Sequence, residues 1–384
     1  MSGPVPEWPL GLAWLAHVLG RDLQRAARAA GGPRALWRCG REPLGRALRL
    51  GGADLERAHR ARREFDAPAR ARRLADAGIV HRSPVDPDYP ETLAELHDPP
   101  FGLFLTGRVD EALACLAEGP VVAIVGSRRA TAAGRALARE VAGGLAERGA
   151  VVVSGLAHGI DAAAHEGALA AGGVTVAVLG CGVDVPYPRR NRVLAARIAA
   201  SGMLISEYWP GTPPAPWRFP ARNRVVAGLA QAVAVIEAGR RSGALITADF
   251  GLELGRPVLA VPGWPGSLAS EGCNGLLRAG AGLLEEAADV VFEIPRGPWR
   301  EETPAEVGAV PEGLAGAIHE LLQREPMGAN RLAAELGEGP AEVAGALALL
   351  EVEGLVVRGE AQRFWAAPAP RGHPAPEREG RARA

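Results

Sequence analysis

Apolar residues in the middle of the chain form short continuous runs separated by longer amphipathic stretches. The first run, Val121–Val125, is rich in Val, which is typical of a strand buried on both faces. Thr131 then stands at a predicted N-cap, before an Ala-rich helix that should reach about Arg148. The same alternation predicts strands at residues 121–125, 150–154, 174–179, 203–206, 232–236 and 257–261.

Strands that alternate with helices predict βαβ units, and therefore an α/β protein with a doubly wound, mainly parallel sheet. Ligands of such sheets bind at the carboxyl ends of the strands. The chemically distinctive residues fall at these predicted ends, and they are Gly126–Arg128, Ser154–Gly155, Gly180–Asp184, Glu207 and Glu237.

The turn after the first strand has the composition of an anion site. A buried strand that passes through Gly126 into a helix start presents free backbone N–H groups and the positive end of the helix dipole. Arg128 and Arg129 add guanidinium donors suited to phosphate oxygens. Phosphate is the anion that this combination favours.

Short helices broken by Gly and Pro are predicted over residues 8–76, at 10–19, 22–30, 44–50 and 53–64. Several arginines follow in residues 57–73, and they form either a module that contacts phosphates or an ordinary solvated helix face. A connector rich in Pro then leads to a short strand predicted at 101–106.

Residues 312–366 carry three apolar helical stripes followed by a hairpin pattern, which describes a winged helix. The sequence therefore predicts a helical domain at 1–85, a Rossmann-like domain at 86–295, a linker at 296–311, the winged helix at 312–366, and a disordered tail at 367–384.

The net charge of −1 predicts no partner, but its distribution is uneven. Residues 1–85 carry +8, whereas residues 301–384 carry −6, which weakens the case for duplex binding by the winged helix. Every one of the 43 basic residues is Arg, a bias that codon usage explains better than selection for guanidinium chemistry.

Four widely spaced cysteines argue against a zinc site or a disulfide framework and fit a reducing cytoplasm. The chain shows neither a signal peptide nor an apolar run of membrane-spanning length. We therefore expect a soluble, cytoplasmic protein with no metal and no membrane partner.

The sequence lacks the motifs that bind nucleotide cofactors. Gly126 is followed by Ser-Arg-Arg instead of the spacing that binds dinucleotides, and a chain without lysine cannot form a Walker A loop. Ser154, His158, Asp161 and His165 resemble parts of a hydrolytic or metal site, but the sequence lacks a nucleophile elbow, so capping and packing roles are favoured. No cofactor is expected.

Two further stretches carry candidate binding residues. Phe219–Arg224 combines two arginines with an amide and an aromatic ring, as single-strand binders do. These arginines could instead pair with Glu207 or Glu237, and both roles can coexist. Glu237–Thr247 is a second strand–loop–helix turn, with small residues where the backbone must approach a ligand.

The order of Val125–Arg128, Ser154–His165, Phe219–Arg224, Ser242–Thr247 and Ala260–Gly263 closely resembles the DNA-processing protein A (DprA/Smf) family. The resemblance runs from about residue 89 to 294. It implies an extended Rossmann-like fold flanked by a sterile-alpha-motif-like helical domain and a winged helix.

The resemblance also implies a function. Members of this family are non-enzymatic homodimers that bind and protect incoming single-stranded DNA and help to load the RecA recombinase in natural transformation. Carried over by motif, the DNA contacts are expected at Gly126, Ser127, Arg128, Gly155, Phe219, Arg222, Asn223, Arg224, Ser242 and Gly243. Many relatives place Lys in this basic pocket, where the present chain offers only Arg.

Two other functions compete with this one. A nucleotide-processing enzyme related to phosphoribohydrolases would need a Pro-Gly-Gly-x-Gly-Thr loop, whereas this chain has Pro262-Gly263-Trp264. A transcription factor acting through the winged helix is disfavoured by the acidic charge of that region.

Overall fold

The computed structural model describes residues 7–185, 187–294, 299, 313–352, 355–358 and 363–366. Two compact units divide the chain, residues 1–301 and 302–384. No helix in these described ranges is long and apolar enough to cross a membrane.

The first unit is built on a mixed sheet, which has nine strands in the described part of the chain. Their spatial order is β1-β2-β6-β5-β4-β3-β7-β8-β9. The strands are β1 (Val80–Arg82), β2 (Leu103–Gly107), β3 (Val121–Val125), β4 (Val151–Ser154), β5 (Thr175–Val178), β6 (Met203–Ser206), β7 (Ala232–Val235), β8 (Val258–Ala260) and β9 (Gly282–Leu283). β1 and β2 pair antiparallel, and β2 pairs antiparallel with β6, whereas the other pairs are parallel.

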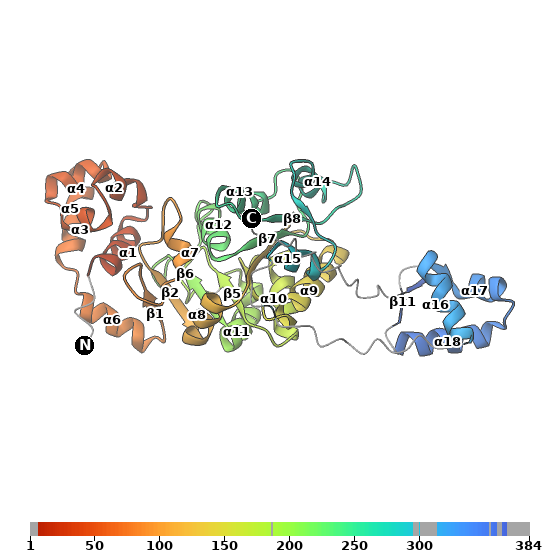
Figure 1. Ribbon diagram of the computed structural model, residues 1–384. Helices are drawn as coiled ribbons and strands as arrows, with labels where there is room; N and C mark the ends of the chain where they lie inside the picture. Colours follow the sequence, from red (N-terminus) through yellow and green to blue (C-terminus); the bar gives the residue numbers. More distant parts are fainter. Residues whose placement is uncertain are drawn as a thin grey trace, which may run out of the picture. The chain divides into compact units, whose positions relative to one another are not determined.

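All six strands predicted for the Rossmann-like part are confirmed to within one residue at each end. They are buried on both faces, because alternate side chains enter different cores. One face of all six strands enters a shared core, whereas the other face enters a second core at β3, β4, β7 and β8 and a third core at β5 and β6. Val121 and Ala123 of β3 face the core shared with α12 (Arg218–Leu229) and α13 (Ala244–Glu253), whereas Val122 and Ile124 face α9 (Ala132–Glu147) and α10 (Ile160–Ala170) on the opposite side (Figure 1).

The helices around this sheet are α7 (Glu91–Ala94), α8 (Val109–Glu118), α9 (Ala132–Glu147), α10 (Ile160–Ala170), α11 (Arg192–Ser201), α12 (Arg218–Leu229), α13 (Ala244–Glu253), α14 (Glu271–Arg278) and α15 (Ala287–Glu293), with a 3-10 turn at Arg189–Asn191. Thr131 caps α9 as predicted, because its hydroxyl oxygen accepts a hydrogen bond from the Gly134 amide at 2.9 Å.

From residue 7 onward, where the description of the chain begins, six helices precede the sheet, namely α1 (Glu7–Leu19), α2 (Gln24–Ala29), α3 (Pro33–Arg38), α4 (Arg41–Leu48), α5 (Gly52–Arg63) and α6 (Ala67–Asp76). Their core includes Phe104 of β2 and Val183. β1 also lies within residues 1–85 yet pairs with β2. The helices and the sheet therefore share one compact unit, and the domain boundary at residue 85 stays a prediction.

The second unit confirms the winged helix. It contains α16 (Leu314–Arg324), α17 (Ala329–Leu336), α18 (Pro340–Val352) and the strands β10 (Met327–Gly328), β11 (Val356–Arg358) and β12 (Arg363–Ala366). The predicted stripes supply its core, for example through Ile318, Leu332 and Leu347. The linker at 296–311 (except Trp299) and the tail at 367–384 lie outside the described residues.

Close packing of α9 against α10 generates a stability prediction. An added Cβ at Gly167 of α10 would lie 2.2 Å from the carbonyl oxygen of Arg139 in α9. Gly167→Ala should therefore destabilise the protein by about 1–3 kcal/mol in urea unfolding, because the two backbones must separate. Gly143→Ala is the matched control in α9, where the nearest atom is 3.7 Å away. It should stabilise by about 0.5–1 kcal/mol, and equal effects of both changes would contradict the close packing.

Candidate functional site

A cleft of about 780 Å³ opens at the carboxyl ends of β3, β4 and β7, between α12 and α13. The loops that follow these strands and the first turns of both helices form its walls. It brings together nine of the ten predicted site residues, which are Gly126, Ser127, Arg128, Gly155, Phe219, Arg222, Asn223, Ser242 and Gly243. The exception is Arg224.

One wall of the cleft combines cations with aromatic rings. The guanidinium carbon of Arg128 lies 5.3 Å from the centroid of the Phe219 ring, which in turn stacks on Tyr187 at 5.4 Å and 27°. Arg128 and Arg129 are exposed, and Phe219 is half-buried. The Phe219 ring lies close to Gly180, where an added Cβ would come within 2.9 Å of it. This wall therefore offers donors for phosphate and a flat apolar surface for a planar group.

Tyr187 was not among the predicted residues. Tyr187 follows Gly180–Asp184, which the sequence places at the end of a predicted strand. An aromatic residue so close to a predicted strand end is the sequence feature that indicates a site residue. Arg241, which also lines the cleft, lay inside the stretch Glu237–Thr247 without being assigned a role.

The floor of the cleft is organised by Arg222, whose side chain is buried with 4% exposure. Its guanidinium donates hydrogen bonds to the carbonyl oxygen of Gly155, at 2.7 Å, and to that of Val178. Burial lowers the pKa of Arg222, while the nearby carboxylate of Asp161 opposes that shift. An added Cβ at Gly155 would lie 2.4 Å from this guanidinium, so a larger residue there would displace the Arg222 side chain.

Asp161 is the matching buried acid. Burial raises its pKa, and Arg222 together with the Ala157 amide, which donates at 3.3 Å, lowers it. The pair therefore holds the loop after β4 against α12. We interpret Arg222 chiefly as a group that shapes the floor of the cleft, with a guanidinium edge lining it.

The sequence predicted free backbone amides in the turn before α9. This prediction is wrong for the amides of Ser127 and Thr131, which donate hydrogen bonds to Glu237. The carboxylate of Glu237 accepts hydrogen bonds from the Thr131 amide, at 3.1 Å, and from the Thr131 hydroxyl, at 2.7 Å. The Ser127 amide donates to the Glu237 carbonyl oxygen at 2.6 Å. An internal carboxylate thus already complements this helix dipole, and the exposed side chains of Arg128 and Arg129 are the cationic groups that the turn adds for an anion.

The start of α13 opens onto the cleft. Gly243 is exposed, and no atom lies within 4 Å of the position that a Cβ would take. Its carbonyl oxygen accepts a hydrogen bond from the Asn223 side chain at 3.2 Å, which ties α12 to α13. Ser242 and Gly243 therefore stand where an anion can approach the positive end of this helix.

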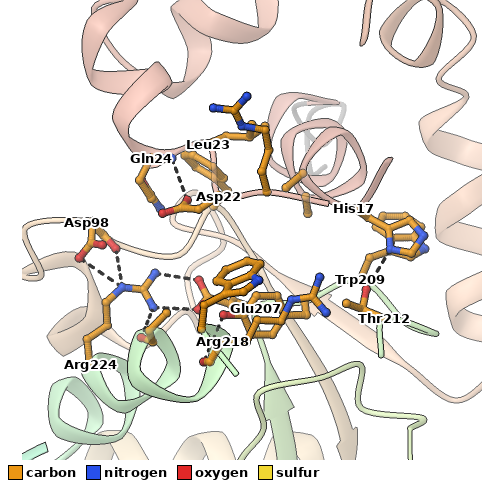
Figure 2. A pocket seen from close by; sticks show the side chains of 17 residues that line it. His17, Asp22, Leu23, Gln24, Asp98, Glu207, Trp209, Thr212, Arg218 and Arg224 are labelled. Atoms are coloured by element: carbon orange, nitrogen blue, oxygen red, sulfur yellow. Dashed lines mark hydrogen bonds and ion pairs between the residues drawn. The ribbon is translucent and has the colours of Figure 1, made fainter. Parts of the chain in front are cut away.

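Arg224 lies apart from the cleft. Figure 2 shows its guanidinium between Glu207 and Asp98, beside a smaller cavity of about 70 Å³ under α1 and α2. Its side chain donates to the two carboxylate oxygens of Glu207 at 2.8 and 2.7 Å and lies 3.2 Å from a carboxylate oxygen of Asp98. Burial disfavours the charge of Arg224, but the ion pair with Glu207 raises its pKa.

Helical geometry explains why the two arginines separate. Residues two positions apart on a helix point about 200° from each other, so Arg222 enters the cleft while Arg224 faces the N-terminal helices. The internal pairing with Glu207, considered from the sequence as an alternative, is the arrangement observed. Arg224 as a DNA contact is not supported by its position.

Of the residues that resembled a catalytic or metal site, Ser154 and His165 have packing roles, whereas His158 is exposed beside Arg128 and Phe219. The Ser154 hydroxyl donates to the Ile124 carbonyl oxygen at 2.6 Å. His165 bonds to the Thr175 hydroxyl at 2.7 Å, and burial lowers the pKa of His165 to about 3. Among the residues that the structure describes, three or more His, Cys, Asp or Glu side chains nowhere form a cluster that could hold a metal ion.

Fold and cleft together define a doubly wound α/β domain with a cationic and aromatic cleft, joined to a winged helix. Residues 81–295 match the family model of DNA recombination-mediator protein A, and residues 302–362 match the DprA winged helix domain. The chain belongs to the family of DNA recombination-mediator protein A, also called DprA or Smf.

Several relatives are similar in sequence to more than half of the chain. The putative DNA processing protein DprA of Mycobacterium tuberculosis is 48% identical over 238 residues, which is 61% of each chain. The DNA processing protein DprA of Streptococcus pneumoniae is 45% identical over 209 residues, 54% of this chain and 72% of that protein. The match thus spans less than two thirds of the mycobacterial relative.

Solved structures of DprA proteins are also similar to this chain. The X-ray structure of DprA from Streptococcus pneumoniae aligns with a TM-score of 0.63 at 33% identity, covering 78% of this chain and all of that one. DprA from Helicobacter pylori, whose structure was described for its single-stranded DNA binding mode, aligns with a TM-score of 0.50 at 30% identity, covering 56% of this chain and 95% of that one.

The position of Arg224 predicts a structural role that can be measured. Arg224→Ala should lower the stability by up to about 3–5 kcal/mol, because the carboxylate of Glu207, which is 16% exposed, would lose its partner. The exposed Arg241 is the control, and Arg241→Ala should change stability by no more than about 0.5 kcal/mol. Thermal and urea unfolding of both variants decide the matter. An Arg224→Ala protein as stable as the parent would mean that the buried ion pair does not form.

Proposed function

We propose that this protein binds single-stranded DNA in the cleft and acts as a recombination mediator. The observation that carries the proposal is the wall on which Arg128 covers the ring of Phe219 and Phe219 stacks on Tyr187. Guanidinium groups bind phosphates, and a ring that is partly open to solvent can stack on a base. Together, phosphate binding and base stacking suit a DNA strand whose bases are unpaired.

Duplex DNA fits this wall poorly, because its base faces are covered by neighbouring base pairs. An unpaired strand can place its phosphates on Arg128 and Arg129 and turn a base toward Phe219. The similarity to relatives of DprA type supports the same ligand, since the structure of one of them was described for its single-stranded DNA binding mode. Such binding should show little sequence preference, because every base has an aromatic face.

The wider role follows as part of the proposal. The protein would act in the cytoplasm as a homodimer, protect incoming single strands, and help to load a RecA-type recombinase during natural transformation. Its chemistry would be binding without catalysis. The alternative, a nucleotide-processing enzyme of phosphoribohydrolase type, is disfavoured because Pro262-Gly263 is followed by Trp264 instead of the glycine-rich catalytic loop.

The central test compares the affinities for single-stranded and double-stranded DNA. Fluorescence anisotropy should show tighter binding to labelled oligo-dT than to blunt duplex of equal length, and no release of base from nucleoside monophosphates. Equal or tighter binding to duplex would contradict the proposal, and base release would favour the enzymatic alternative.

Arg128 is predicted to contact a phosphate. Arg128→Ala should weaken binding to every sequence by a similar factor, and should flatten the slope of log affinity against log salt by about 0.7, since one fewer counterion is displaced. Arg197→Ala, an exposed arginine on α11 outside the cleft, is the matched control and should leave the slope unchanged. Identical slopes for both variants and the parent would remove Arg128 from the site.

Phe219 is predicted to stack on a base. Phe219→Ala should cost about 1–3 kcal/mol of binding free energy for oligo-dT, whereas Phe219→Tyr, which keeps the ring, should bind nearly as well as the parent. Anisotropy titrations measure both. A folded Phe219→Ala variant with parental affinity would show that the ring only fills space beside Gly180.

A further inference from the structure

A tight turn after β8 exposes two large apolar side chains beside the cleft. Trp264 is 82% exposed and Leu268 is 76% exposed. Single apolar residues on a surface are common and need no explanation by themselves. Two properties of this turn, its rigidity and its position, distinguish it from such residues.

The backbone that carries Trp264 is fixed. The Ser267 amide donates to the Trp264 carbonyl oxygen at 3.0 Å, with Pro265 in the second position and Gly266, at φ +90°, in the third, as in a type II turn. Gly263, the preceding residue, is held at both backbone groups by the side chain of Asn274, at 3.1 and 2.9 Å. A ligand that stacks on Trp264 would therefore not need to order the backbone first.

The turn is packed onto the wall of the cleft. The Leu268 carbonyl oxygen lies 2.9 Å from the position that a Cβ would take at Gly239, and Gly239 lines the cleft. The Gly272 amide donates to the Ala238 carbonyl oxygen at 2.8 Å, which joins the far end of the same loop to that wall. Exposed Arg240 follows Gly239 directly.

We propose that Trp264 is a second stacking platform, which receives an unpaired base of the DNA strand where that strand leaves the cleft. The exposed Arg240 and the cleft-lining Arg241, which follow Gly239 in the loop that contacts Leu268, would hold the phosphates that connect the two stacked bases. A bare indole on a rigid turn suits any nucleobase, because stacking on it needs no hydrogen-bond partner. This inference rests on the proposed function, since it extends the same strand beyond Phe219.

The test uses the full-length protein with three variants and two kinds of strand. Trp264→Ala should weaken binding to oligo-dT of about 16 nucleotides by roughly 5- to 150-fold, and Trp264→Phe should recover most of that loss because it keeps an aromatic face. Both should bind an abasic strand of equal length as the parent does, because such a strand has phosphates but no bases. Arg128→Ala, by contrast, should lose affinity for both strands.

Oligonucleotide length gives an independent readout. With oligo-dT of about 2 nucleotides, which has a single connecting phosphate and so cannot follow both arginines from Phe219 to Trp264, Trp264→Ala should match the parent. The inference is overturned if Trp264→Ala binds the long oligo-dT as tightly as the parent, or if it loses equal affinity for the abasic strand. It is also overturned if the variant changes the molar mass measured by light scattering, since the turn would then be a contact between protein chains. A parent protein that binds no strand at all would instead refute the proposed function itself.

Discussion

The cleft depends on a guanidinium group buried beneath it. Arg222 reaches from α12 to the carbonyl oxygens of Gly155 and Val178, and so joins the ends of two neighbouring strands to one helix. A buried cation is costly unless it is paired, and here the buried carboxylate of Asp161 offsets part of that cost. The separation of α12 from the sheet edge, and with it the position of Phe219, follows from this contact.

The same helix also links the cleft to the N-terminal helices. One face of α12 carries Phe219 and Arg222 into the cleft, while another carries Arg224 to the ion pair with Glu207 (Figure 2). Hydrogen bonds from Gln24 to the Pro99 carbonyl oxygen, at 2.6 Å, and between His17 and Thr212, at 2.9 Å, fasten α1 and α2 nearby. The N-terminal helices thus support the element that presents the stacking ring.

Much of the fold could be predicted from the sequence, because buried parallel strands leave unbroken apolar runs such as Val121–Val125. Shorter elements gave weaker signals. β1 has three residues, and its pairing with β2 depends on a chain segment more than twenty residues away. α3 was missed although Pro33 occupies its first turn, a recognised start signal.

The site was predictable in composition but not in all its contacts. Small residues and arginines at the ends of predicted strands indicated the cleft. The hydrogen bond from Thr131, the N-cap of α9, to Glu237 forms because β3 and β7 are neighbours in the sheet, and no local sequence pattern predicts that pairing. Helical periodicity alone predicts that Arg222 and Arg224 point in different directions, and therefore that both cannot line the cleft.

The most direct measurement is a crystal structure of the protein with oligo-dT. We predict a phosphate within hydrogen-bonding distance of the Arg128 guanidinium and a thymine ring stacked on Phe219, with Arg224 still paired to Glu207. A strand bound on the arginines of residues 57–73, with the cleft empty, would contradict the assignment of the cleft as the DNA-binding site.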